Sequence, residues 1–197
     1  MFQQLPTAGL PFQFEEWSQL EGYVDDMMHT GVIDVFDEIR WDLRPSPKFG
    51  TLEVRVCDGI PSMAELLSIS ALTHCLVEFF SSELDAGREL PTVPPWFAQE
   101  NKWRSARYGM DAILILDKHA DEELVTTHLH RVLEQLAPIA ERLHCTEELG
   151  GIHDIISGGA SYQRQRRVAA MNGGELDAVV GSLVEEMRAG RPLLNFP

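Results

Sequence analysis

Alternating apolar and polar residues predict a short β-hairpin between Trp41 and Asp58, with its turn at the Pro/Gly-rich segment 45–50. Successive side chains of an extended strand point to opposite faces. In the second strand, the apolar face therefore carries Leu52, Val54 and Val56, and the polar face carries Thr51, Glu53, Arg55 and Cys57. In the first strand, Trp41 and Leu43 lie opposite Asp42 and Arg44. If the apolar sides lie together, the charged side chains of both strands share one face.

Apolar residues at helical spacing predict that most of the remaining chain is helical. We expect helices over about 14–30, 63–84, 96–108 and 121–143, a shorter helix or turn over 145–156, and a last helix ending near Ala189. Gly158 and Gly159 precede a segment rich in Gln and Arg, residues 161–171. The acidic connector 32–40 has room for one more helical turn, and the tail 191–197 is expected to be loose. Residues 112–116 are wholly apolar, and periodicity leaves a strand and a buried helical turn equally open.

Three details refine the helices. Ser62 is placed to cap the 63–84 helix, and Glu65 three residues later completes a capping-box pattern. That helix is apolar nearly all round, which predicts a central buried helix. Pro138 is expected to kink or split the 121–143 helix, because proline lacks the N–H that a helix interior uses.

Composition and charge narrow the class of protein. With 197 residues, 44% of them apolar and 24% charged, the chain is expected to form one globular domain, 1–197. A net charge of -15 argues against nucleic acid or an anionic membrane as a partner. Three widely spaced cysteines favour neither a disulfide framework nor a zinc site. The N-terminus lacks a basic region, and no apolar run reaches the ~20 residues of a membrane span. We therefore expect a cytoplasmic protein.

The charged face of the hairpin is the first candidate site. Asp42, Arg44, Glu53 and Arg55 have an ordinary interpretation as cross-strand ion pairs on a solvated face. The functional interpretation makes Glu53 a Mg²⁺ ligand and Arg44 and Arg55 ligands of phosphoryl oxygens, because Mg²⁺ takes carboxylates together with substrate phosphates. Spacing alone leaves both interpretations open.

A second candidate lies in the segment E-N-K-W-R-S-A-R-Y-G, residues 100–109. Asn101, Arg104 and Arg107 fall on one helix face at steps of three. They form either a surface helix paired with carboxylates or an anion-binding face for a nucleotide or a substrate. Residues 157–167, S-G-G-A-S-Y-Q-R-Q-R-R, are a weaker candidate. They form either an anion site at a helix N-terminus or a flexible helix entry with a basic solvated face, and they lack a recognised phosphate-loop pattern.

These motifs together resemble a known family. The segment W-D-L-R-P-S-P-K-F-G-T-L-E-V-R-V-C-D, the long apolar helix, E-N-K-W-R-S-A-R-Y-G-M-D-A, the opening Q-Q-L-P-T-A-G-L-P and the late G-A-S-Y-Q-R-Q-R are similar to carboxylate–amine ligases of the glutamate–cysteine ligase type 2 group. The likeness runs along the whole chain but covers only about the C-terminal half of the family pattern. It implies an α+β fold: part of a glutamine-synthetase-like antiparallel sheet packed against several helices.

The resemblance also implies a chemistry. ATP would activate a carboxylate, typically the γ-carboxylate of glutamate, as an acyl phosphate that an amine such as that of cysteine then attacks. Glu53 would be a Mg²⁺ ligand, Arg55 and Arg44 catalytic phosphate-binding groups, and Asn101, Arg104 and Arg107 nucleotide-binding residues. Because the N-terminal half of the pattern is missing, we expect the isolated chain to have little activity and to pair with a missing half or with itself. The alternative is a non-catalytic remnant that acts as a self-associating module.

Overall fold

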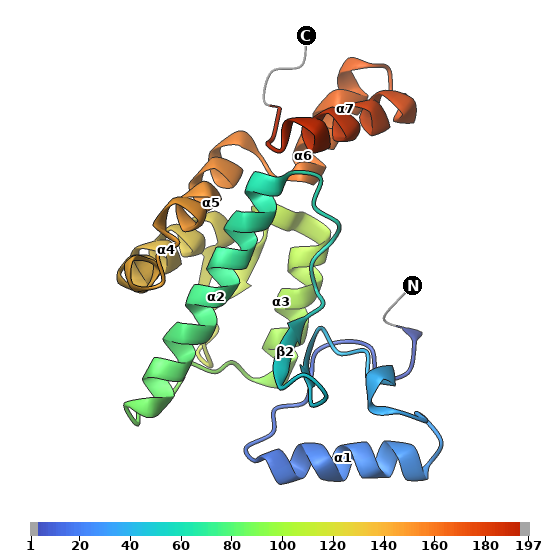
Figure 1. The fold of residues 1–197 in the computed structure, drawn as a ribbon, viewed down its shortest axis with the longest axis vertical. Helices are drawn as coiled ribbons and strands as arrows, with labels where there is room; N and C mark the ends of the chain where they lie inside the picture. Colours follow the sequence, from blue (N-terminus) through green and yellow to red (C-terminus); the bar gives the residue numbers. More distant parts are fainter. Residues whose placement is uncertain (1–3, 194–197) are drawn as a thin grey trace. The chain divides into compact units, whose positions relative to one another are not determined.

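The structure is a computed structural model that describes residues 4–193. The chain divides into two compact units, residues 1–59 and 60–197. Helices dominate, and the strands form two small antiparallel sheets of two strands each (Figure 1). This confirms the predicted helix-rich α+β class. The prediction of one domain resembling the C-terminal half of a ligase stays a prediction.

The first unit is built on an aromatic cluster. It contains α1 (Trp17–His29), the 3₁₀ turn η2 (Phe36–Glu38), β1 (Leu43–Ser46) and β2 (Thr51–Val54). Trp41, 3% exposed, packs on Tyr23 with ring centroids 5.0 Å apart, and Phe12 and Phe14 also contact it at 6.1 and 6.0 Å. The N-terminal segment is thereby held against the start of the hairpin, where Gly9 also forms a parallel bridge with Trp41.

The hairpin has the predicted pairing, and its apolar face is exposed in the structure. Arg44 lies directly across from Glu53, as expected for residues on one face. Arg44 is 7% exposed, whereas the apolar residues of the other face are 37–62% exposed: Leu43, Leu52, Val54 and Val56. Within this unit the charged face is therefore the covered one at Arg44, because Arg44 lies over the backbone of the η2 segment.

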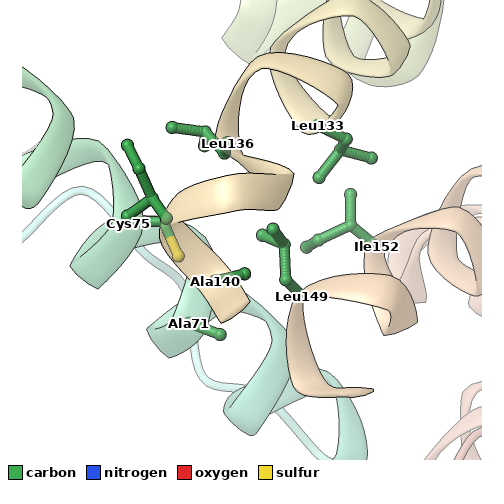
Figure 2. Close-up of a cluster of buried hydrophobic side chains, with 8 residues drawn as sticks. Ala71, Cys75, Leu133, Leu136, Ala140, Leu149 and Ile152 are labelled. Carbon is green, nitrogen blue, oxygen red and sulfur yellow. The ribbon is translucent and has the colours of Figure 1, made fainter. Parts of the chain in front are cut away.

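The second unit has a three-helix core. α2 (Met63–Asp85), α4 (Val125–Arg142) and α5 (Thr146–Gly158) enclose one apolar cluster. Figure 2 shows Leu133, Leu136 and Ala140 of α4 facing Cys75 of α2 and Leu149 of α5. The residues of this cluster are each at most 7% exposed. Burial of this common face, rather than helix propensity, is what stabilises helices of this length.

The predicted all-round burial of the 63–84 helix is wrong, and of the two effects expected at Pro138 the split does not occur. α2 is not buried all round: its buried residues, Glu65, Ser68, Ala71 and Cys75, follow one stripe, and Leu67, Val77 and Leu84 are 47–60% exposed. Pro138 does not split α4, which is continuous from Val125 to Arg142. The buried residues Leu136, Ile139 and Ala140 on both sides of the proline hold that turn in place.

The apolar segment 112–116 resolves as a strand. β3 (Ile113–Ile115) pairs antiparallel with β4 (Glu122–Leu124), with Leu114 across from Glu123. The predicted helix at 121–143 therefore begins later, at Val125, because residues 122–124 are used in the sheet. α3 (Pro95–Tyr108) precedes this sheet and ends where predicted, at Gly109, whose φ is 57°. The 3₁₀ turn η3 (Gly109–Asp111) joins α3 to β3.

Two further helices complete the second unit. α6 (Ser161–Met171) and α7 (Leu176–Ala189) pack on each other beyond the end of α5 (Figure 1). Of the tail predicted to be loose, residues 194–197 lie outside the described part, while the N–H of Leu193 donates to Glu186 at 3.2 Å. Contrary to the sequence prediction, α2 has the length and the mean hydropathy (1.4) that a membrane-crossing helix would need. Among the described residues it is the one helix that does, and the core helix of a soluble protein meets the same two criteria.

Candidate functional site

Arg44 anchors the charged face of the hairpin. Its Nη2 and Nε donate to Glu53 Oε2 at 2.8 and 3.2 Å, and its Nη1 donates to the carbonyls of Asp37 and Ile39, both at 2.6 Å. All three nitrogens therefore donate within the protein, which uses four of the five N–H groups, and only 8% of the side chain is exposed. In this geometry Arg44 fixes the position of Glu53 and is largely withdrawn from solvent.

Glu53 and Arg55 form the accessible part of the same face. Glu53 Oε1 accepts a hydrogen bond from Arg55 Nη1 at 3.3 Å, and the two side chains are 43% and 30% exposed. The N–H of Arg55 donates to the carbonyl of Asp42 at 2.7 Å, which holds this residue beside the start of β1 although it lies beyond β2. The Arg55 guanidinium is the group of this face that an anion from solvent can reach.

The hairpin does not by itself fit a magnesium ion. Mg²⁺ needs carboxylate oxygens that are free to coordinate it in an octahedral shell. Both oxygens of Glu53 already accept hydrogen bonds from guanidinium groups, whose positive charge disfavours a second cation. Within residues 4–193, no group of three or more His, Cys, Asp or Glu side chains could hold a metal ion.

The second candidate face, on α3, is also bound to its own protein. Asn101 pairs with both backbone groups of one residue of β3: its Nδ2 donates to the carbonyl of Ile115, and its Oδ1 accepts from the N–H of Ile115, both at 2.8 Å. This double contact imitates a neighbouring strand on the edge of β3 opposite β4. The amide thereby satisfies backbone groups that a two-stranded sheet would otherwise leave unpaired.

Arg104 continues the same edge one turn later. Its Nη1 donates to the carbonyl of Ile113 at 3.0 Å and to Glu122, and its Nε donates to Glu100 at 3.0 Å. The hydrogen bonds that Arg104 donates to Glu122 and then to Glu100 raise the pKa of Arg104 above its ordinary value. Arg107 is different: it is exposed and stacks over Tyr108, 5.6 Å from the ring centroid, without an ion pair to another described residue. Asn101 and Arg104 are therefore bound to the protein itself, whereas Arg107 is accessible to a ligand.

An open hollow of about 450 Å³ lies beside this edge. Trp103 and Tyr108 form its aromatic wall, with ring centroids 5.7 Å apart, and Arg104 with three carboxylates forms the polar wall: Glu100, Asp111 and Glu122. The hollow and the hairpin belong to different units of the chain.

The sequence interpretation missed a buried charge cluster. Arg164 of α6 is 2% exposed and lies between Glu65 of α2 and Glu186 of α7. It donates to both oxygens of each carboxylate at 2.7–3.0 Å and to the carbonyl of Gly159 at 2.7 Å. Burial disfavours the charged guanidinium, but the bonds to Glu186 and Glu65 outweigh it, so the pKa of Arg164 is raised. Glu65 was interpreted as a capping residue; only the Ser62 half of that cap forms, at 3.3 Å.

The segment 157–167 serves the fold in the same way. Gln163 Oε1 accepts from the N–H of Ala160 at 2.9 Å, and the Tyr162 hydroxyl accepts from the N–H of Met110 at 2.9 Å. A Cβ added at Gly109 would lie 2.5 Å from that hydroxyl, so the glycine allows Tyr162 to approach η3. α6 begins in this segment, as the helix-entry interpretation predicts, but the expected solvated basic face is wrong at Arg164, which is 2% exposed.

Comparison with known proteins identifies a family and several similar relatives. Residues 1–183 match the family model described as glutamate-cysteine ligase family 2 (GCS2). A protein of Paenarthrobacter aurescens named "Putative glutamate--cysteine ligase 2-2" is 60% identical over 190 residues, which are 96% of this chain and 50% of that protein. Similarly named proteins of Arthrobacter sp. (strain FB24) and Mycobacterium tuberculosis are 59% and 58% identical, again over half their length.

The chain therefore spans about half the length of the curated relatives it matches. The match nevertheless covers nearly all of the chain, including the hairpin, the α3–β3 edge, Glu65 and Arg164. The sequence resemblance is thus confirmed, and the chain belongs to glutamate-cysteine ligase family 2.

Proposed function

We propose that this chain supplies part of the active site of an ATP-dependent carboxylate–amine ligase of the glutamate–cysteine ligase type. Such an enzyme joins a carboxylate to an amine by way of an acyl phosphate. Family membership supports this proposal, and the observation that carries it is the row Arg44–Glu53–Arg55, in which one guanidinium is buried as an anchor and the other is accessible.

The two arginines of that row have different proposed roles. Arg55 binds phosphoryl oxygens, because its guanidinium is exposed and can exchange its single bond to Glu53 for a charge-assisted bond to phosphate. Arg44 is a positioning residue that holds Glu53 against the hairpin. In the same proposal, Arg107 is the α3 residue that contacts the nucleotide, while Asn101 and Arg104 position the helix that carries it.

No side-chain nucleophile is needed for this reaction. The substrate carboxylate attacks the γ-phosphorus of ATP, the bond to the β-phosphate oxygen breaks, and ADP leaves. The substrate amine then attacks the acyl carbon, the bond to phosphate breaks, and the amine loses a proton. The role of the arginines is to stabilise negative charge on the transferred phosphoryl group.

The proposed activity requires residues from outside this chain. Glu53 offers one carboxylate already bound by two arginines, so Mg²⁺ accompanying ATP needs further ligands from the other half of the family's length. We therefore propose that the 197 residues alone have little ligase activity. For the complete enzyme we propose small-molecule substrates, ATP and Mg²⁺ as cofactors, and a cytoplasmic location.

A half-complementation experiment tests the proposal. This chain is co-expressed with the part of the Paenarthrobacter relative that it does not cover, and ATP-, glutamate- and cysteine-dependent phosphate release is measured. Activity should appear in the mixture and fall about 100-fold or more with Arg55→Ala, the size of effect of removing one transition-state donor. Glu83→Gln, which breaks the exposed pair with Arg88 in the other unit, is the matched control and should retain activity.

The alternative function is a non-catalytic, self-associating module. The uncovered apolar face of the hairpin favours it, because Leu52 and Val56 are 50% and 62% exposed. Calorimetry separates the two functions. The ligase proposal expects Mg²⁺–ATP to bind the complemented protein with an affinity that Arg55→Ala reduces. The module expects no nucleotide binding, and that result would reject the ligase proposal.

A further inference from the structure

One helix of the second unit carries two apolar faces. The inner face of α7 packs against the rest of the unit through Val179 and Glu186, which are 9% and 2% exposed. On another face, residues spaced by four, four and three form a continuous stripe: Leu176, Val180, Val184 and Met187 are 75, 58, 40 and 68% exposed. We call these four residues the α7 stripe. Uncovered large side chains at helical spacing are typical of a helix–helix contact.

The charges beside the stripe indicate what covers it. Asp177 and Arg188 lie three turns apart, so they flank the stripe on the same side at opposite ends of the helix. Arg188 is 72% exposed and bonds Glu185, itself 57% exposed, at 2.7 Å. A surface pair of this kind contributes little and is easily exchanged. Asp177 is exposed and, within the described residues, makes no ion pair.

These positions match a second copy of the same helix in the reverse direction. A two-fold axis at the middle of α7 places Leu176 beside Met187 of the second copy and Val180 beside Val184 of the second copy. The same operation brings Asp177 beside Arg188 of the second copy, and by symmetry Arg188 beside its Asp177. An interface made of one patch on both subunits must be self-complementary in this way.

We propose that the α7 stripe is a self-association surface on which two copies of this chain pair through antiparallel α7 helices. A contact of one 14-residue helix with its copy is smaller than the ~1,200 Å² of a stable interface, so the dimer is weak and concentration-dependent. This proposal does not depend on the proposed ligase function.

The first test is sedimentation equilibrium of the full chain over a range of micromolar to millimolar concentrations. Wild type should shift from monomer to dimer. Val180→Lys should abolish that shift, because it places a charge at the centre of the contact while substituting a side chain that is already 58% exposed. Leu52→Lys, on the exposed face of the hairpin, is the control and should dimerise like wild type. A monomer at all concentrations, or a dimer lost with Leu52→Lys and kept with Val180→Lys, would overturn the proposal.

Charge exchange tests the antiparallel register. Asp177→Arg and Arg188→Asp should each weaken the homodimer about tenfold, because each places like charges together twice. An equimolar mixture of the two variants should recover dimer, since both contacts would then join an arginine of one variant to an aspartate of the other. Circular dichroism checks that each variant is folded. Failure of the folded mixture to recover a dimer would reject the antiparallel pairing.

Discussion

Arg164 of α6 and Glu186 of α7 are joined by two hydrogen bonds, 2.7 Å from Nε and 3.0 Å from Nη2, and each side chain is only 2% exposed. The opposite edge of the same guanidinium makes two bonds of 2.8 Å to Glu65 of α2. One planar group therefore connects three helices. If one member of such a buried cluster is removed, the remaining members keep their charge but have neither an ion-pair partner nor water around them, and the fold is destabilised.

Removing Arg164 should destabilise the second unit strongly. Arg164→Met leaves two buried carboxylates facing each other, and the free energy of unfolding should fall by about 3–5 kcal/mol. Arg164→Lys should rescue little, because an ammonium cannot form two parallel bonds to each carboxylate. Urea unfolding followed by circular dichroism measures both. Arg188→Met, which removes an exposed arginine, is the control and should change stability by less than ~1 kcal/mol.

Asn101 should behave as part of the β3–β4 sheet. Asn101→Ala removes both bonds to Ile115, and we expect a loss of about 1–3 kcal/mol, since two backbone groups lose their partner. Asn101→Asp keeps the acceptor and loses the donor, and should fall between wild type and alanine. Hydrogen exchange at the Ile115 N–H reports the effect locally. Unchanged protection at Ile115 in Asn101→Ala would contradict the anchoring role.

The contact between α2 and α5 depends on Gly151. A Cβ added there would overlap the Ser68 hydroxyl, which itself donates to the Ala64 carbonyl at 2.8 Å. Gly151→Ala should therefore lower the free energy of unfolding by about 1–3 kcal/mol, the usual cost of overpacking. Gly150→Ala, at a site with open space, is the matched control. Ser68→Ala in the Gly151→Ala background should restore part of the loss.

The cysteines should differ in reactivity and in pH dependence. Cys57 is exposed, whereas burial and the neighbouring Cys145 thiol, 3.6 Å away, raise the pKa of Cys75 from 9.0 to about 11. Iodoacetamide at about pH 8 should label Cys57 quickly and Cys75 slowly, because the thiolate is the reactive form. Mass spectrometry of timed samples identifies the labelled sites, and equal labelling rates would contradict this prediction.

The same shift predicts a change of stability with pH. The unfolded thiol ionises at a lower pH than the folded one, so the stabilisation by a protonated Cys75 is complete below about pH 9 and is lost as the pH rises toward 11. The wild type should thus lose stability relative to Cys75→Ala between these pH values. Thermal melts at about pH 7.5 and about pH 10.5 compare the two proteins.

The sequence by itself determined the periodic elements and the family. Helix ends followed local signals that need no tertiary contact: Gly109 ends α3, and Ser62 begins α2. Alternation also placed Arg44 and Glu53 on one face of the hairpin, because side-chain direction in a strand is a property of the backbone. The motifs that identify the family were readable for the same reason, as fixed residues at fixed spacing.

Only the tertiary structure decided which charged residues are anchors. Arg44 and Arg55 are equivalent in the sequence pattern, yet the first is buried over the carbonyls of Asp37 and Ile39 and the second is accessible. Asn101 and Arg107 share one helix face, but only Asn101 meets the open edge of β3. The partners in each case come from residues distant in sequence or from another element. Burial of a charge depends on such partners, and spacing along one element does not specify them.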